Sequence, residues 1–244
     1  TGIAELTIFN LNKRTLVTPL KSSKRTPITH NNIKNLPNIL VIINESFGKN
    51  QGLPFYNSKI NAMPLLTKRI KNNSEWILFK KAFTNSTATD VSVPSMLTGV
   101  NPIESNTKLH SMPLIWDWAK ANNKYTFLLT SQRYSWGKFN KFFFSDSLDI
   151  HLDAESIEAP IINDLGIDDT IMIQELPNIL KKIPNEQGFI GVINTNALHS
   201  PYQKTSQLIT PPDYLNRYQK ALFILDYTID LTISYLNKYD LNNT

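Results

Sequence analysis

Glu45 is the first residue whose type and position suggest chemistry. It directly follows residues 38–44, a β-branched run typical of a strand that is buried on both faces. A carboxylate at the end of such a strand can bind a metal ion over the edge of a sheet. The same side chain could instead cap or begin the next element, and on position alone both interpretations stay open.

Residues 85–99 place four hydroxyl side chains in the turn before an expected helix. Pro94 is expected to open this helix, which runs through Leu97 and ends at Gly99. Its first N–H groups, near residues 93–96, would favour a bound anion such as phosphate. A Thr or Ser hydroxyl in this turn becomes a nucleophile if a metal lowers its pKa. The alternative is a simple capping turn.

His199 lies in the polar stretch that follows a further apolar run, residues 188–193. Histidine is the commonest metal ligand and a ready proton donor to a leaving group, so a functional role competes evenly with a plain loop position. The remaining histidines have no such placement and are expected at the surface: His30, His110 and His151.

The elements that position these residues alternate along the chain. Strands are expected at residues 38–44, 76–83, 125–129 and 188–193, and helices at residues 63–71, 94–97, 113–122, 168–182 and 212–239. This alternation predicts an α/β fold whose mostly parallel central sheet carries helices on both faces. Sites in such sheets form at the carboxyl ends of the strands. The segments expected there are residues 45–46, 84–92, 131–138 and 194–199.

Composition excludes several classes of protein. The chain has 244 residues, 41% hydrophobic and 18% charged, an ordinary balance for one large globular domain. It has no cysteine, which excludes a disulfide scaffold, a thiolate zinc site and a thiol nucleophile. The net charge of +5 is scattered and is compatible with anionic substrates or an anionic membrane surface. No apolar run reaches the roughly 18 to 20 residues that a membrane span needs.

The chain divides into two parts by residue composition and hydrophobic periodicity. Residues 1–36 form a lead-in segment with scattered polar residues and no sustained period, and residues 37–244 form the predicted domain.

Four landmarks in order resemble the phosphoethanolamine transferases and the wider sulfatase-like branch of the alkaline phosphatase superfamily. Residues 38–46, ending in Glu-Ser, look like the opening strand with its metal-binding acid. Residues 87–96, Thr-Ala-Thr-Asp-Val-Ser-Val-Pro-Ser-Met, resemble the nucleophile motif of the transferases. Residues 199–202, His-Ser-Pro-Tyr, are similar to the substrate-side His-x-Pro-Tyr, and residues 218–236 resemble the helix before the last metal-binding strand.

The resemblance implies transfer of phosphoethanolamine from a phospholipid donor to a cell-envelope glycolipid or glycan acceptor, through a phosphothreonine intermediate. Aligned on Ser-Val-Pro, the nucleophile falls on Thr89, and zinc would be bound by Glu45 and Thr89. His199 falls on the histidine that contacts the transferred group or a second zinc. Ser92 and Lys138 are the further candidates for substrate contacts.

The resemblance also implies lipopolysaccharide modification at the periplasmic face of the bacterial inner membrane, with no nucleic-acid partner. The membrane would be reached through a segment absent from this chain. The family's Asp-His zinc pair follows the long helix, and the sequence stops at Thr244, before such a pair. The expectation is therefore a catalytic domain that is incomplete at its C-terminus and inactive by itself.

Other functions stay open beside this one. A sulfatase would use Ser92 as its nucleophile, but Met96 stands where the sulfatase pattern needs an Arg, whose fixed charge Met cannot replace. A phosphoglycerol transferase of the same branch is a second alternative. The third is a truncated or degenerate binding module that keeps the sheet and the anion-binding turn but catalyses nothing.

Overall fold

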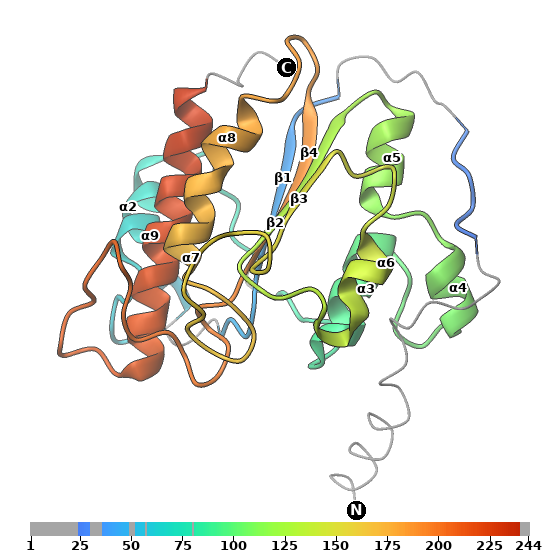
Figure 1. Ribbon diagram of the computed structural model, residues 1–244. Coiled ribbons are helices and arrows are strands. Elements are labelled where there is room, and N and C mark those ends of the chain that lie inside the picture. The colour runs from blue at the N-terminus through green and yellow to red at the C-terminus, as the bar shows by residue number, and fades with distance from the viewer. Residues whose placement is uncertain (1–23, 30–35, 49–51, 57, 80, 240–244) are drawn as a thin grey trace, which may run out of the picture.

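A parallel β-sheet forms the centre of the molecule. The computed structural model describes residues 24–29, 36–48, 52–56, 58–79 and 81–239. In this part of the chain the sheet has four strands in the order β1-β4-β2-β3, all parallel (Figure 1). Their bounds are Ile39–Asn44 for β1, Tyr125–Thr130 for β2, Ile150–Leu152 for β3 and Phe189–Thr195 for β4. The predicted α/β architecture is confirmed.

Strand β4 lies between β1 and β2, and all but one of its residues are buried. Val192 of β4 pairs with Val41 on one side and with Leu128 on the other. Gly191 is required next to it, because a Cβ atom there would lie 2.1 Å from the ring of Phe127. This register brings the carboxyl ends of β1, β2 and β4 to one edge of the sheet, where the predicted site residues follow.

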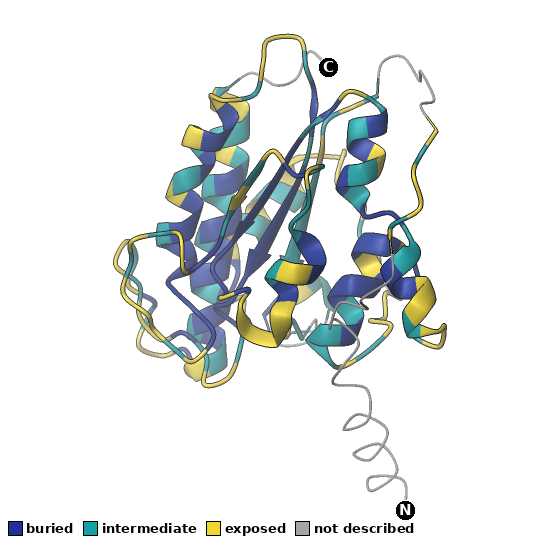
Figure 2. Cartoon of the chain, turned by 45° about the vertical axis from the view of Figure 1, so that its right-hand side comes forward, coloured by how far each residue is buried: buried dark blue, intermediate teal, exposed yellow. Residues whose placement is uncertain are grey.

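Helices cover both faces of the sheet, with their buried sides turned toward it (Figures 1 and 2). One face carries α3 (Thr89–Thr98), α4 (Asn106–Ser111), α5 (Ile115–Ala121) and α6 (Phe139–Phe143). The other carries α7 (Asp169–Met172), α8 (Leu176–Leu180) and α9 (Arg217–Lys238), with the short η4 (Ile173–Glu175) between α7 and α8. Each face has its own core, formed around Trp116 and Phe143 on the first and around Phe127 and Ile193 on the second.

Helix α2 (Pro64–Asn72) packs on α9 through a buried carboxylate. The N-cap residue of α2, Met63, offers no side-chain hydrogen bond. Asp226 of α9 takes over this task, because its two oxygens accept the N–H groups of Leu65 and Leu66, both at 2.8 Å. Desolvation by burial raises the pKa of Asp226 to about 6, despite these two bonds.

Two predicted elements are wrong. No strand forms over residues 76–83 in the described part of that segment, where Ile77, Phe79 and Phe83 are exposed. The apolar run has no neighbouring strand to pair with there, and a strand needs such a partner. Helix α3 begins at Thr89 and not at Pro94, so the N–H groups of residues 93–96 lie in the body of the helix and not at its N-terminus. Gly99 does end it, in a left-handed conformation with φ 71°.

Smaller differences concern the other helices and one histidine. The helix predicted at residues 168–182 is divided into α7, η4 and α8, and the sequence patterns missed β3, α4 and α6. His110 is buried rather than at the surface, edge-on against Phe142 at 5.0 Å between ring centroids. His151 is exposed as expected, and His30 lies outside the described residues.

Most of the predicted lead-in, residues 1–36, also lies outside the described residues, but residues 24–29 contact the domain. Arg25 donates hydrogen bonds to the carbonyl groups of Met112 at 2.6 Å and Phe142 at 2.9 Å, and its guanidinium lies 4.7 Å from the centroid of the Phe142 ring. This part of the chain therefore packs against the helices on the first face of the sheet.

Candidate active site

A hydroxyl and a carboxylate meet at the carboxyl edge of the sheet. Glu45 follows the last residue of β1, and Thr89 is the first residue of α3. The Oγ1 atom of Thr89 donates to the Glu45 carboxylate, 3.1 Å from Oε1 and 3.2 Å from Oε2. This distance is the one expected between a nucleophile and the group that activates it.

The local structure leaves the Thr89 hydroxyl available for this contact. The N-cap residue of α3 is Ala88, which makes no side-chain cap. The turn before it is shaped by other hydroxyl groups, since Thr84 Oγ1 donates to the Ser86 carbonyl at 2.6 Å and Ser86 Oγ accepts from the Ala88 N–H at 3.1 Å. The capping alternative therefore does not describe Thr89.

The loop that carries Glu45 is held by α9. Ser46 has φ 53°, an unusual value for a residue with a side chain, and its hydroxyl donates to Glu45 Oε1 at 3.2 Å. The Tyr218 hydroxyl donates to the Ser46 carbonyl at 3.0 Å and accepts from the Gly48 N–H at 2.7 Å. The Tyr218 ring also packs edge-on against Tyr202, at 5.2 Å between centroids. One helix thus fixes the loop after β1 and contacts the loop after β4.

A cavity of about 510 Å³ opens beside the pair. The end of β1, the turn at residues 84–89 and the first turns of α3 line it, and its lining includes Glu45, Thr89, Ser92 and Met96. Its size lies in the range of small-molecule sites, and the N-terminus of α3 adds the positive end of a helix dipole.

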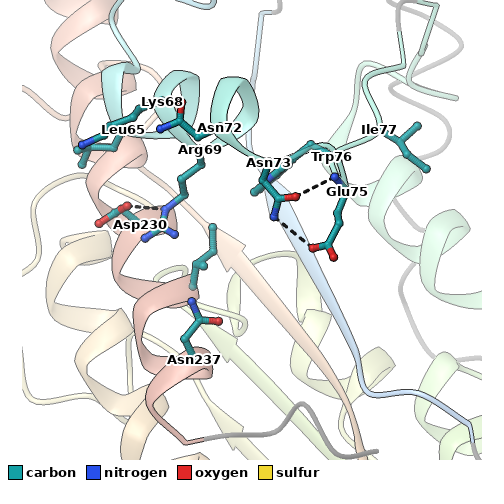
Figure 3. A pocket seen from close by; sticks show the side chains of 11 residues that line it. Leu65, Lys68, Arg69, Asn72, Asn73, Glu75, Trp76, Ile77, Asp230 and Asn237 are labelled. Carbon is teal, nitrogen blue, oxygen red and sulfur yellow. Dashed lines mark hydrogen bonds and ion pairs between the residues drawn. The ribbon is translucent and has the colours of Figure 1, made fainter.

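A larger cavity, about 850 Å³, lies elsewhere, in a groove between α2 and α9 (Figure 3). Arg69 crosses it to form a 2.7 Å ion pair with Asp230, and Trp76 lies on its wall. Its lining has no hydroxyl group beside a carboxylate. Chemistry rather than volume therefore identifies the smaller cavity as the candidate site.

Two other predicted site residues, His199 and Lys138, do not line this cavity. His199 follows β4 in a loop, with its side chain 29% exposed and Nδ1 4.0 Å from Asp164 Oδ1. Lys138 ends the short helix η3 (Trp136–Lys138), is exposed, and has φ 61°. The structure brings Glu45, Thr89 and Ser92 together, while His199 and Lys138 are not among the described residues that line the cavity.

Sequence patterns missed two buried polar residues behind the site. Tyr134 is buried, and its hydroxyl accepts from Asn194 Nδ2 at 3.1 Å. Burial, with a smaller contribution from the Glu45 charge, raises the pKa of Tyr134 to about 12, so the phenol stays protonated near the carboxylate. Both residues fall in segments that the sequence placed at the carboxyl edge of the sheet, residues 131–138 and 194–199, but their residue types did not single them out there.

A metal site is only partly formed by these residues. Glu45 and Thr89 offer oxygen atoms side by side, but tetrahedral zinc takes about four ligands. No group of three or more His, Cys, Asp or Glu side chains in the described ranges is arranged to hold a metal ion. The two oxygen donors fit part of a zinc site, and the described residues do not complete it.

Comparisons with known proteins identify the family and the fold. The sulfatase family profile matches residues 37–244. A protein in the alkaline phosphatase superfamily from Vibrio parahaemolyticus has a similar structure, with a TM-score of 0.67 at 17% identity, covering 94% of this chain and 59% of its own. Comparison with curated protein sequences gave no match.

Two further structures are similar. The C-terminal periplasmic domain of EcEptC from Escherichia coli, also solved as a complex with zinc, has a TM-score of 0.67 at 16% identity, over 88% of this chain and 64% of its own. The lipooligosaccharide phosphoethanolamine transferase EptA from Neisseria meningitidis is an integral membrane protein. It has a TM-score of 0.68 at 16% identity, and the similarity covers 98% of this chain and 46% of EptA.

These findings confirm the resemblance to the alkaline phosphatase superfamily and its fold. The chain spans less than two thirds of the length of each of the three structures. Among the helices that the structure describes, none combines the length and the apolar character needed to cross a bilayer.

Proposed function

The chain belongs to the sulfatase family, and from this premise we propose that it transfers phosphoethanolamine from a phospholipid donor to a cell-envelope glycolipid or glycan acceptor, through a phosphothreonine at Thr89. The observation that carries the proposal is the hydrogen bond from the Thr89 hydroxyl to Glu45, at the mouth of a cavity and at a helix N-terminus. The similarity to EptA, a phosphoethanolamine transferase, supports the choice of transferred group.

In the first half-reaction the Thr89 oxygen attacks the phosphorus atom of the donor. A bond forms between Thr89 Oγ1 and phosphorus, and the bond from phosphorus to the diacylglycerol oxygen breaks. Glu45 is the group within reach of the Thr89 proton, at 3.1 Å. The diacylglycerol oxygen takes up a proton as it leaves, so the hydroxyl proton is in effect moved from Thr89 to the lipid product.

In the second half-reaction an acceptor hydroxyl attacks the same phosphorus atom. The bond to Thr89 breaks, Thr89 regains a proton, and the acceptor loses one. His199, at the carboxyl end of β4, would assist one of the two half-reactions as a proton donor or acceptor. Phosphoryl transfer depends chiefly on positioning and charge stabilisation. The N-terminus of α3, Ser92 and Lys138 are proposed to supply these for the transferred group.

We propose Glu45 and Thr89 as zinc ligands in the complete site, in keeping with the zinc complex of EcEptC. Bound zinc would lower the pKa of the Thr89 hydroxyl and so make it a better nucleophile. The proposed location is the periplasmic face of the bacterial inner membrane, supported by the periplasmic domain of EcEptC and the membrane protein EptA.

One observation favours a phospho-transferase over sulfate ester hydrolysis. In the described contacts Glu45 binds the hydroxyl of Thr89 and not that of Ser92, the residue that a sulfatase would use. Met96, which replaces the Arg of the sulfatase pattern, is 52% exposed at the cavity and supplies no cation.

The test is covalent loading of Thr89. The protein, expressed from its complete reading frame, is incubated with zinc and micelles of phosphatidylethanolamine, and peptide mass spectrometry locates the added phosphoethanolamine group. We expect the adduct on Thr89 in the wild type, none in Thr89→Ala, and an unchanged adduct in Thr87→Ala, whose hydroxyl lines the same cavity without bonding to Glu45.

Glu45→Gln should reduce both the bound zinc and the rate of loading. An adduct that persists in Thr89→Ala, or that maps to Ser92, would refute the assignment of the nucleophile. Hydrolysis of an aryl sulfate by the wild type, without phosphoethanolamine loading, would establish the sulfatase alternative.

A further inference from the structure

Asp169 is a buried carboxylate that the mechanism above does not use. It is the first residue of α7 and is fully inaccessible to solvent. Its Oδ1 atom accepts from the Ser131 hydroxyl at 2.5 Å and from the Asn196 N–H at 2.8 Å. Its Oδ2 atom accepts from the Ala197 N–H at 2.9 Å. One side chain thus satisfies two backbone groups and one hydroxyl.

These donors come from two loops at the carboxyl edge of the sheet. Ser131 directly follows β2, and Asn196 and Ala197 directly follow β4. The Asn196 carbonyl in turn accepts the N–H of His199 at 2.9 Å. A buried N–H that loses its hydrogen-bond partner destabilises the folded state, so the segment cannot move away from Asp169 without a loss of stability.

No hydrogen bond to the His199 ring is found among the residues that the structure describes. Its Nδ1 atom is buried without a hydrogen-bond partner in the described part of the chain, and the nearest carboxylate oxygen, on Asp164, is 4.0 Å away. The position of the ring therefore depends on the backbone from which it projects, and that backbone is held by Asp169.

We propose that Asp169 is a positioning residue: through the N–H groups of Asn196 and Ala197 it sets the place of His199 relative to the Glu45–Thr89 pair. It touches neither substrate nor reacting atoms. Its kinetic consequence rests on the proposed function, whereas its effect on the loop does not.

The first test needs no activity. Hydrogen-exchange mass spectrometry compares the wild type with Asp169→Asn and Asp168→Asn. Asn at position 169 keeps the size but presents an N–H₂ group to one of the N–H donors, so residues 196–202 should lose protection. Asp168 is the matched control, because it is the N-cap of α7 and Asn caps equally well. Its carboxylate accepts from Thr170 and from the N–H of Gln207, and so makes no bond to residues 196–202, whose protection is measured.

The second test separates the two half-reactions by rapid quenching. In Asp169→Asn, the half-reaction that His199→Ala slows should be slowed about 10- to 100-fold, because small misplacements of a catalytic group have effects of this size. The other half-reaction should stay within about twofold, which a general loss of stability would not explain. Adding Asp169→Asn to His199→Ala should produce little further loss, because both changes remove the same interaction.

Full additivity of the two losses, or unchanged protection of residues 196–202 in Asp169→Asn, would overturn the inference. If Asp169→Asn does not fold, Ser131→Ala removes one donor to the same carboxylate and should produce the same pattern at smaller size. If the wild type forms no phosphothreonine, the proposed function fails, and the exchange experiment alone decides whether Asp169 holds the loop.

Discussion

Replacing Asp226 by Asn should change how the stability of the domain depends on pH. The carboxylate is buried in α9, where it accepts the first N–H groups of α2. Asn has a similar shape but does not titrate. The variant loses one of the two hydrogen bonds to α2 at every pH, which lowers its stability by a constant amount of about 1 to 2 kcal/mol. Any difference between the two proteins that changes with pH therefore reports the titration of the Asp226 carboxyl group.

The magnitude follows from the pKa of Asp226, which burial raises from 3.8 to about 6. The folded state therefore binds a proton more tightly than the unfolded state. The stability from this proton is complete below the unfolded pKa and is lost as the pH rises through the folded pKa. From about pH 5 to about pH 7.5 the loss is about 1.4 kcal/mol.

Urea unfolding of the wild type and Asp226→Asn at these two pH values measures the effect. The stability advantage of the wild type over the variant should shrink by about 1.4 kcal/mol on going to the higher pH. The pKa of Asp169 is also raised to about 6 by burial, but this group is common to both proteins and cancels. Asp213→Asn, at a fully exposed carboxylate, is the control and should show no such change. A wild-type advantage that stays constant with pH would refute the reasoning.

Two further substitutions test the scaffold around the site. Gly99→Ala should lower the free energy of unfolding by about 1 kcal/mol in urea titrations. The space for a Cβ atom is open, but a φ of 71° disfavours any residue with a side chain. An unchanged free energy of unfolding would show that α3 ends differently. Arg25→Ala should lower the free energy of unfolding by about 1 to 3 kcal/mol by the same measurement, since it removes the hydrogen bonds to Met112 and Phe142. The neighbouring Lys24→Ala is the control and should have no effect. Equal losses in the two variants would mean that residues 24–29 do not pack against the domain as described.

The sequence was most informative where signals are local. Three strands were predicted close to their observed bounds, because a run such as residues 39–43 is apolar throughout and an Asn flanks it on each side. The prediction that this strand is buried on both faces was wrong, since β1 lies at the edge of the described sheet and its residues are at most half-buried, with Ile39 exposed. The position of Glu45 at the edge of the sheet followed directly. Gly99 marked the end of α3 for an equally local reason, since few other residues adopt a left-handed conformation.

Local signals failed where distant residues decide the structure. Pro94 suggested a helix start, but the turn made by Thr84 and Ser86 and the contact of Thr89 with Glu45 begin α3 one and a half turns earlier. Residues 76–83 have the composition of a strand but gain no partner strand in the described part of the chain.

By itself, therefore, the sequence determined that this protein has a parallel α/β sheet and which loops follow its strands, because hydrophobic runs and special residues act over a few positions. Only the tertiary structure decided that the Thr89 hydroxyl meets Glu45, 44 residues away, and that Asp169 holds the loop of His199. Such contacts depend on where parallel strands end in space, and the register that sets those ends is fixed by packing across the whole sheet.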